Sequence, residues 1–159
     1  MAADIYAVHQ FLSNIDSKAL WQRRGHKVLL LSERKLENSR EVGVDFPKNT
    51  QLPFTLRIRP VYRSHDPESG KVIEKRLPAD QMMQNLRNKA SGAGFTFLDA
   101  LASSEEPYAL KKPGSTIQLY SMYIVGTLRV LNTPLFRSVL CHGMGRSKRF
   151  GFGMINVWE

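Results

Sequence analysis

The sequence predicts an α+β fold in which a ferredoxin-like βαββαβ domain follows a shortened ferredoxin-like half. From residue 71 onward the expected elements run strand, helix, strand, strand, helix, strand, which is the ferredoxin-like order. Residues 1–64 show only part of that pattern, a helix and two strands. We therefore divide the chain into an N-terminal unit, residues 1–64, and a C-terminal domain, residues 65–159. RNA-recognition modules arranged in tandem share this layout, but a fold alone does not assign a function.

The N-terminal unit opens with a predicted helix at residues 4–14, with Asp4 as its cap. Its apolar stripe at helical spacing consists of Ile5, Val8, Leu12 and Ile15. Tyr6 and His9 lie three residues apart on a neighbouring polar stripe, so both project from one face of the helix. The elements expected next are a strand at 26–32, a loop at 37–52 and an alternating strand at 54–62.

Turn and cap residues divide the C-terminal domain into elements. Pro78 begins a helix, and Gly126 is expected to bulge or bend a long strand. Thr133 is the expected N-cap of the last helix, with Pro134 in its first turn, and Gly143 ends that helix. The expected elements are a turn at 66–70, a strand at 71–77, a helix at 78–92, a short strand at 95–98, a loop at 103–114, a strand at 116–131, a helix at 133–143 and a strand at 152–158.

Charge and composition indicate a nucleic-acid partner and a reducing compartment. The 23 Lys and Arg residues outnumber 14 Asp and Glu, which gives a formal charge of +9. A sequence pI near 9.9 is typical of a nucleic-acid-binding domain, although a basic solvated surface is the alternative. The single cysteine, Cys141, excludes an internal disulfide. No signal peptide is recognisable and the apolar runs are short, so we expect a cytoplasmic protein without a membrane partner.

The most informative stretch is GMGRSKRFGFG at residues 143–153. Its four glycines permit positive φ and close backbone approach, and they bracket three cations. Because the loop follows a helix and precedes a strand, a phosphate there would meet the negative end of the helix dipole, unlike in a mononucleotide-binding loop. We therefore expect amides and cationic side chains to follow a nucleic-acid backbone. An ordinary glycine-rich loop with solvated charges is the alternative.

A second basic feature is the expected hairpin of residues 54–77. Arg57 and Arg59 point away from the apolar face of its first strand, and Lys75 and Arg76 lie on the returning strand. Such a hairpin is able to clamp a nucleic-acid backbone, or it is an exposed edge protected by charges.

Residues with metal-ligand spacing are absent from the sequence, as are the motifs of serine and zinc hydrolases. The remaining inventory of histidine, tyrosine and cations suits RNA cleavage without metal. In that reaction a base takes the proton of a 2′-OH, which attacks the adjacent phosphate. We therefore expect no metal and no cofactor.

Three stretches of the chain resemble the CasE endoribonucleases, which process CRISPR RNA in type I-E Cascade systems. They are DIYAVHQFL at 4–12, LPFTLRIRPVYR at 52–63 with KVIEKRLP at 71–78, and IVGTLRVLNTP at 124–134 followed by GMGRSKRFGFGMINV at 143–157. The resemblance implies a metal-independent endoribonuclease that cuts the repeat at the base of an RNA hairpin and leaves a 2′,3′-cyclic phosphate. It also implies that the enzyme retains the mature RNA. The implied partners are the repeat hairpin and other Cascade-like subunits, including the backbone subunit next to the RNA 3′ end.

The resemblance also assigns roles to single residues. His9 becomes the candidate general base or acid, and Tyr6 the residue that orients the 2′-OH or donates to the phosphate. The residues expected to contact RNA are Arg57, Arg59, Lys75, Arg76, Arg87, Gly143, Gly145, Arg146, Ser147, Lys148, Arg149, Gly151 and Gly153.

The chain departs from the family near its N-terminus. The predicted first helix starts almost at Met1, without the family's preceding strand, and the segment before Phe54 is short. We therefore expect a compact variant, such as one from a type IV-like system, whose N-terminal sheet is incomplete or completed by another chain.

Two other functions remain open. One is a non-catalytic cap that only binds the 3′ hairpin of the RNA inside a complex. The other is a basic ribosome-associated structural protein. A cleavage assay distinguishes the endoribonuclease from the cap. The identity of co-purified RNA distinguishes both of these from the ribosome-associated protein.

Overall fold

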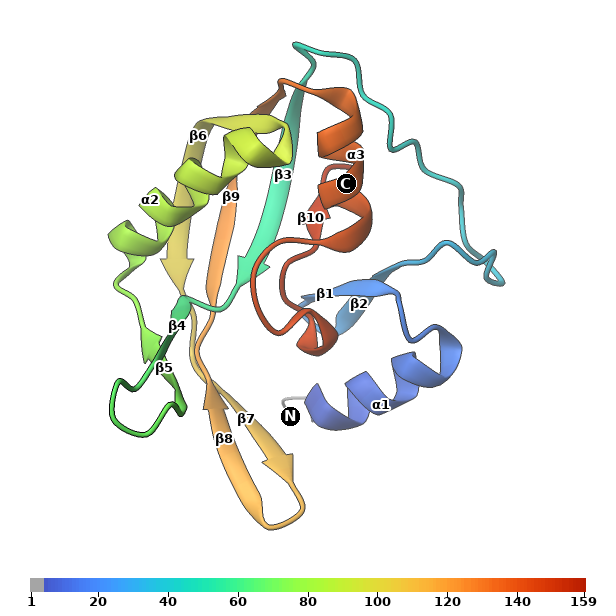
Figure 1. Ribbon diagram of the computed structural model, residues 1–159. Helices are drawn as coiled ribbons and strands as arrows, with labels where there is room; N and C mark the ends of the chain where they lie inside the picture. The colour runs from blue at the N-terminus through green and yellow to red at the C-terminus, as the bar shows by residue number, and fades with distance from the viewer. Residues whose placement is uncertain (1–4) are drawn as a thin grey trace.

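The computed structural model describes residues 5–159 and is organised around one four-stranded antiparallel sheet (Figure 1). In spatial order its strands are β10 (Ile155–Asn156), β3 (Gln51–Ile58), β9 (Met122–Val130) and β6 (Phe95–Ser104). The two helices α2 (Ala79–Ala90) and α3 (Thr133–His142) pack on one face of this sheet. The order along the chain, β3, α2, β6, β9, α3, β10, is the ferredoxin-like βαββαβ pattern. The predicted α+β class and ferredoxin-like domain are therefore confirmed.

The first strand of this sheet differs from the prediction. The strand expected at 71–77 is instead β5 (Val72–Arg76), which pairs only with β4 (Val61–His65) in a separate hairpin. The single strand expected at 54–62 is divided between β3 and β4, because Pro60 lacks the amide that would continue the ladder. The division at residue 64 stays a prediction, while the sheet takes its first strand from residues on the N-terminal side of it.

The N-terminal unit consists of α1 (Ile5–Ile15), β1 (Leu20–Arg24) and β2 (Lys27–Leu31). The predicted helix is confirmed, although Asp4, its expected cap, lies outside the described residues. β2 was expected but β1 was not. The two strands form a tight hairpin whose turn contains Gly25 at a φ of 60°. A long irregular segment then runs from Ser32 to Thr50 along the outside of the molecule, in agreement with the expected loop (Figure 1).

A hairpin that the sequence analysis did not predict projects from the end of the sheet, as Figure 1 shows. It consists of β7 (Tyr108–Lys112) and β8 (Ser115–Leu119), so the loop expected at 103–114 and the unbroken strand expected at 116–131 are both wrong. β6 also runs several residues beyond its expected end. The bulge predicted at Gly126 of β9 is absent, since Gly126 pairs in continuous register with Phe54 and with Ala100; the register shift lies instead in β6, between Phe97 and Asp99. A Cβ at Gly126 would lie 2.2 Å from the Asp99 carbonyl oxygen.

The last helix begins one residue earlier than predicted. Its N-cap is Asn132, whose Oδ1 accepts a hydrogen bond from Leu135 N at 3.0 Å, and not Thr133. Thr133 Oγ1 instead donates to the carbonyl of Phe46 at 2.6 Å, which fastens the long loop to the helix. The helix ends at Gly143 as predicted. None of the described helices is long and apolar enough to cross a membrane.

The buried apolar residues among residues 5–159 form two separate clusters. The larger, which we call the sheet core, lies between the sheet and helices α2 and α3. Its most deeply buried side chains include Leu56, Ile58, Leu86, Phe95, Ile124, Leu128, Phe136 and Leu140. The smaller, which we call the α1 core, joins α1, β1, the β7–β8 hairpin and the chain just before β10. Its buried members are Ile5, Leu12, Trp21, Leu110, Leu119, Phe150 and Phe152.

Candidate nucleic-acid interface and active site

The glycine-rich segment between α3 and β10 folds back on itself. Met144 N donates to the Gly153 carbonyl at 2.8 Å, so the two ends of the loop lie side by side. Gly153 has a φ of 88°, and a Cβ there would lie 2.3 Å from the Met144 oxygen. Only glycine fits this close approach. Gly143, Gly145 and Gly151 also have positive φ, so all four predicted glycines shape the loop.

The tip of the loop packs against α1. It contains a short 3₁₀ turn, η2 (Lys148–Phe150), whose Phe150 ring lies edge-on to His9 with centroids 5.2 Å apart. Trp21 of β1 donates its indole N–H to the Arg149 carbonyl at 3.1 Å, and a Cβ on Gly151 would approach this indole to 2.7 Å. Two of the predicted site elements, the first helix and the glycine-rich loop, are therefore neighbours in space.

His9 lies half-buried in this contact. Desolvation by burial lowers the pKa of His9 below its ordinary value of 6.5, and the nearby positive charge of Arg149 lowers it further. A hydrogen bond with the Arg149 backbone works in the opposite direction. The Oγ of Ser13, one turn along α1, lies 3.2 Å from His9 Nδ1. The imidazole is therefore neutral at pH 7 and able to accept a proton.

Tyr6 lies on the same side of α1 as His9. The centroids of the two rings are 6.3 Å apart and both residues are partly buried. The three-residue spacing that predicted a shared helix face is thus confirmed, although the catalytic roles of both residues stay predictions.

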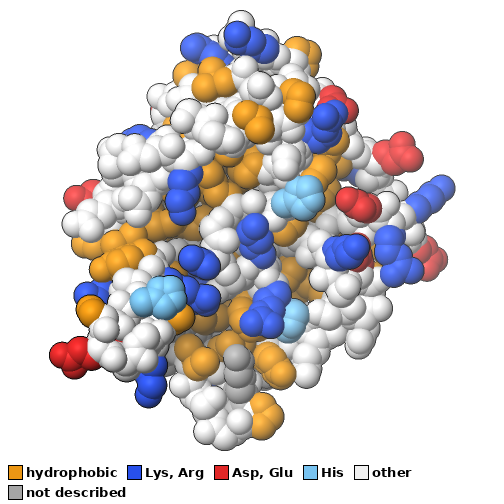
Figure 2. Space-filling view, in the orientation of Figure 1, with side chains coloured by type: hydrophobic (Ala, Val, Ile, Leu, Met, Phe, Trp, Pro, Cys, Tyr) orange, Lys and Arg blue, Asp and Glu red, His pale blue; other side chains and the backbone are white. Residues whose placement is uncertain are grey.

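The three predicted cations of the loop face solvent to different degrees. Arg146 and Arg149 are exposed and Lys148 is half-buried. Within residues 5–159, none of the three pairs with a carboxylate; the Arg149 guanidinium instead lies 5.2 Å from the Phe150 ring centroid. Figure 2 shows Lys and Arg side chains gathered over the middle of this face, while the acidic side chains lie at its margins.

Arg57 of β3 and Arg59, just after β3, are buried, in contrast to the loop cations. Arg57 is 8% exposed, and its guanidinium makes two hydrogen bonds to Glu105, at 2.7 and 3.1 Å. It also donates to the Arg23 carbonyl and lies 5.0 Å from the centroid of the Tyr123 ring. Arg57 therefore ties β1 to the main sheet, and contact with RNA stays a prediction for it.

Arg59 has a similar structural position at the end of β3. It is 7% exposed, and it donates to Ser147 Oγ at 2.9 Å and pairs with Glu74 of β5. Glu74 also pairs with Arg63 at 3.3 Å. Arg59 thus joins the β4–β5 hairpin to the glycine-rich loop at Ser147, which itself has a φ of 60°. Its contact with RNA likewise stays a prediction.

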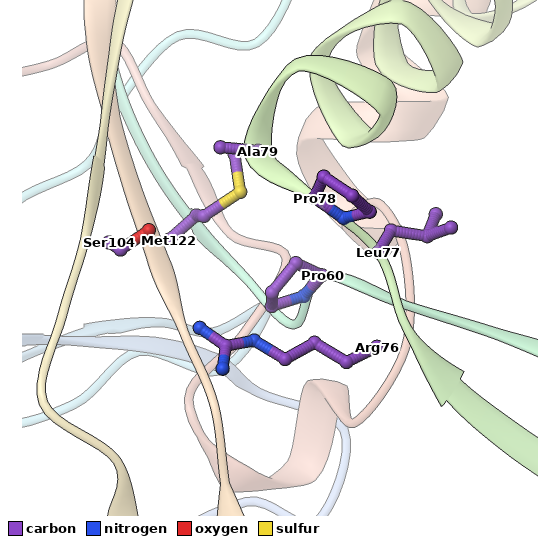
Figure 3. Close-up of a pocket in the computed structure, with 7 residues that line it drawn as sticks. All are labelled: Pro60, Arg76, Leu77, Pro78, Ala79, Ser104 and Met122. Carbon is purple, nitrogen blue, oxygen red and sulfur yellow. The ribbon is translucent and has the colours of Figure 1, made fainter.

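The remaining predicted contacts lie on exposed elements. Lys75 and Arg76 are exposed on β5, and Arg76 stacks on Tyr120 at 4.1 Å. Arg76 also lines a cavity of about 260 Å³, where its side chain extends beneath Pro60 toward the strand that bears Met122 (Figure 3). Arg87 is exposed on α2, which lies on the opposite side of Figure 1 from α1. Arg87 is therefore apart from the site built by α1 and the loop.

Three residues that shape the site were not predicted to do so. Trp21 supports the loop, Gln22 joins β1 to the sheet through Thr55 Oγ1 at 3.1 Å, and Glu105 fixes Arg57. The LWQRR segment alone carries no signal for these contacts, since they depend on the unpredicted strand β1. The sequence signal for β1 is Gly25, a turn residue directly before the strand expected at 26–32, which permits a hairpin with the residues that precede it.

Comparisons with known proteins agree with this arrangement. A family model described as CRISPR associated protein matches residues 16–158. No match was found among curated proteins. Three solved structures illustrate the likeness of the fold. Cas6e from Escherichia coli K-12 has a TM-score of 0.81 at 19% identity, covering 96% of this chain and 91% of that chain.

The other two structures are complexes. Thermus thermophilus Cse3 bound to an RNA representing a pre-cleavage complex gives a TM-score of 0.74 at 20% identity, covering 99% of this chain and 90% of that chain. A chain of E. coli Cascade bound to a PAM-containing double-stranded DNA target gives 0.68 at 20% identity, covering 98% and 91%. At these identities the likeness establishes a shared fold, whereas the family model spans nearly the whole sequence. The chain therefore belongs to the CRISPR-associated protein family, as its resemblance to the CasE endoribonucleases predicted.

Proposed function

We propose that the protein is a CRISPR RNA endoribonuclease that cleaves repeat RNA at the base of a hairpin without a metal. One observation carries the proposal: His9, held neutral by burial and by Arg149, packs directly on the tip of the cationic glycine-rich loop. A proton acceptor and phosphate-binding cations thus share one surface, in a chain of the CRISPR-associated family. That family also favours this function over a ribosome-associated structural role.

The reaction needs only groups that this surface offers. His9 takes the proton of the 2′-OH at the scissile nucleotide, and the 2′-oxygen then bonds to the adjacent phosphorus. The bond between phosphorus and the 5′-oxygen breaks, which leaves a 2′,3′-cyclic phosphate on one product. The departing 5′-oxygen takes a proton from water and becomes a hydroxyl, and His9 releases the proton that it accepted to solvent. Tyr6, beside His9 on α1, orients the 2′-OH or donates to a phosphate oxygen.

Arg149 has two effects in this scheme. Its charge favours the neutral form of His9, which is the form that accepts a proton. Its exposed guanidinium, together with Arg146 and Lys148, also stabilises the negative charge that develops on the phosphate in the transition state. The loop therefore contributes to both binding and chemistry.

The proposal extends to the assembly. Cse3 occurs in a complex with RNA, and a chain of the same fold occurs in Cascade. We accordingly propose that this protein stays on the mature RNA, next to the backbone subunit of a Cascade-like complex. Retention is favourable because contacts to the hairpin phosphates are unchanged by cleavage of a bond at its base.

The decisive experiment starts from the RNA that co-purifies with the protein, which identifies the repeat. That repeat is then incubated with excess protein in EDTA, and the 3′ end of the product is analysed by mass spectrometry. We expect cleavage to persist in EDTA and the product to carry a cyclic phosphate. A 2′-deoxy nucleotide at the scissile position should abolish cleavage and spare binding. Tight binding without cleavage would instead establish the non-catalytic cap, and a strict Mg²⁺ requirement would refute the mechanism.

A further inference from the structure

A second cavity is lined by Trp21, the residue that also supports the glycine-rich loop. It has a volume of about 380 Å³ and lies between α1 and the β1–β2 hairpin. Ile5, Val8, Trp21 and Val28 give it apolar walls, and Trp21, only 3% exposed, forms part of its floor. Pockets that bind small organic ligands begin at about this size and are mostly apolar with a few polar groups. We call it the α1–hairpin pocket.

The polar groups of this pocket are basic. Arg23, His26 and Lys27 line it, and none of the described lining residues is acidic. His26 and Lys27 are exposed, whereas Arg23 is half-buried. A ligand with a flat apolar body, hydrogen-bond acceptors and a negative charge matches such a lining.

The side chain of Arg23 gives more specific evidence that the pocket binds a ligand with hydrogen-bond acceptors. Its Nε donates to the Gly25 carbonyl at 3.2 Å, and its guanidinium lies 5.2 Å from the Tyr108 ring centroid, so its position is fixed. Its Nη1 is nevertheless buried and has no hydrogen-bond partner within residues 5–159. Buried donors are rarely left unpaired, and a bound ligand is one ordinary explanation for an exception.

We propose that the α1–hairpin pocket binds one unpaired nucleobase of the RNA whose phosphates the glycine-rich loop contacts; this inference rests on the proposed function. Proteins that read single-stranded RNA splay bases out, pack them on aromatic and apolar surfaces and hydrogen-bond their edges. In this pocket the base lies between Val28 and the α1 side chains, and Arg23 Nη1 donates to an acceptor on its edge. Lys27 and His26 at the mouth face its phosphate.

The position of Trp21 joins this pocket to the active site. The same indole that lines the pocket donates to the Arg149 carbonyl, next to His9. A nucleotide held in the pocket is therefore adjacent to the one whose 2′-OH reacts. The base in the pocket sets which phosphate lies at His9, so it determines the cleavage position and contributes sequence preference at an unpaired nucleotide.

Two protein variants test the pocket without disturbing the loop. Val28 is 39% exposed at the mouth, so the indole of Val28→Trp fills the pocket from outside. Its matched control is Leu98→Trp, which adds an indole at a residue 40% exposed on β6, outside the pocket. Arg23→Met removes the unpaired donor. Arg24→Met is its control: Arg24 Nη1 is also buried without a hydrogen-bond partner among the described residues, but it lies outside the pocket, 3.6 Å from a Glu159 carboxylate oxygen.

The RNA probes are the co-purified repeat and versions of it with one abasic site at each unpaired nucleotide beside the stem. With the unmutated protein, we expect one abasic position to weaken binding about fivefold to 150-fold, the usual loss for one stacked base. That same position should cause no loss in Val28→Trp and a reduced loss in Arg23→Met. In both control variants the full loss should persist, and 4-thiouridine at that position should crosslink to the β1–β2 hairpin.

The possible failures are distinguishable. If the unmutated protein does not bind the hairpin at all, the proposed function fails and the pocket assignment fails with it. If the hairpin binds tightly but no abasic position weakens binding by more than about twofold, against the fivefold or greater loss expected for a stacked base, only the pocket assignment is overturned. The same holds if the abasic loss is as large in Val28→Trp as in Leu98→Trp, because the base would then lie elsewhere.

Discussion

The sheet core and the α1 core are built differently and serve different purposes. The sheet core packs two helices on a sheet, and nearly all of its members come from elements with a clear local pattern. The α1 core joins three parts of the chain that are far apart in the sequence: α1 with β1, the β7–β8 hairpin, and the segment before β10. None of these parts buries an apolar face by itself. The sheet core therefore determines the fold, while the α1 core aligns His9 with the glycine-rich loop.

The glycine-rich segment takes part in both clusters. Met144 and Ile155 belong to the sheet core, and Phe150 and Phe152 belong to the α1 core. The backbone between them is also fixed, since Gly153 N donates to the Arg57 carbonyl at 2.8 Å. The two ends of the loop are therefore packed in the sheet core, and its tip is packed in the α1 core. Damage to either cluster should therefore have separable effects on stability and activity.

The largest expected effect is on chemistry alone. Replacing His9 with Ala removes the proposed general base, which typically costs about 10²–10⁴ in rate. Because His9 is only partly buried, its loss should change the free energy of unfolding by about 1 kcal/mol or less. Single-turnover cleavage and urea unfolding measure the two quantities. His142→Ala, on the exposed face of α3, is the matched control and should cleave normally. Cleavage by His9→Ala at the normal rate would show that the base is a different residue.

A pair of matched cavities separates the two clusters directly. Leu86 in the sheet core and Leu110 in the α1 core are each 1% exposed. Leu86→Ala should lose about 2–5 kcal/mol of stability, while the fraction that remains folded cleaves at the normal rate. Leu110→Ala should lose stability toward the lower end of that range, because a small cluster is better able to collapse around the gap. It should also slow cleavage, since Leu110 packs where α1 carries His9. Equal stability losses with unchanged rates in both would mean that the α1 core has no aligning role.

The sequence predicts the sheet core much better than the α1 core. Helical spacing predicts α1 and α3, Pro78 and Gly92 bound α2, and alternation predicts most of β3, because these signals are local. The strand expected at 116–131 contains β9. Strand pairing is not local. Both β3 and the segment of β5 precede α2, so the βαββαβ order fitted either as the first strand, and only the register with β9 distinguishes them.

The sequence predicts the residues of the site but not the contacts that bring them together. The loop cations, Tyr6 and His9 were identified, whereas the contact between α1 and η2 depends on β1 and on the β7–β8 hairpin. Ser, Glu, Pro and Lys dominate residues 103–114, so local composition predicts a loop where β7 forms. Alternation correctly directed Arg57 away from the sheet core. It gave no sign that β1 and Glu105 cover the other face, so burial of Arg57 was unforeseen.

Salt dependence tests whether the cations of the loop contact RNA phosphates. Arg146, Lys148 and Arg149 changed together to Ala should weaken hairpin binding and reduce the log–log salt slope by about two to three units, at roughly 0.7–0.9 per lost phosphate contact. The control variant changes three exposed lysines away from the loop, Lys35, Lys48 and Lys89, and should reduce the slope by less. Filter binding at several salt concentrations gives both slopes. An unchanged slope in the loop variant would remove the loop from the RNA interface.

The smallest expected effect concerns how the loop tunes His9. Burial, and then the charge of Arg149, lower the pKa of His9 below 6.5. A general base works in its neutral form, so kcat/KM should rise with pH through this lowered pKa and be constant above it. Arg149→Ala removes the charge but keeps both the burial and the backbone carbonyl that bonds His9. The pKa of His9 should therefore rise without the opposing hydrogen bond being lost, and the midpoint of the pH profile should move to higher pH.

Arg146→Ala is the control for this last shift, because it removes the same charge from the same loop at a residue that does not act on the pKa of His9. Its profile should keep the midpoint of the unmutated protein even if its affinity falls. The pH dependence of kcat/KM between about pH 5 and 8 reports the ionisation of groups in the protein without bound RNA. If both variants move the midpoint equally, the effect is one of total loop charge, and the specific contact between Arg149 and His9 does not tune the base. If neither moves it, the pH profile reports a group other than His9.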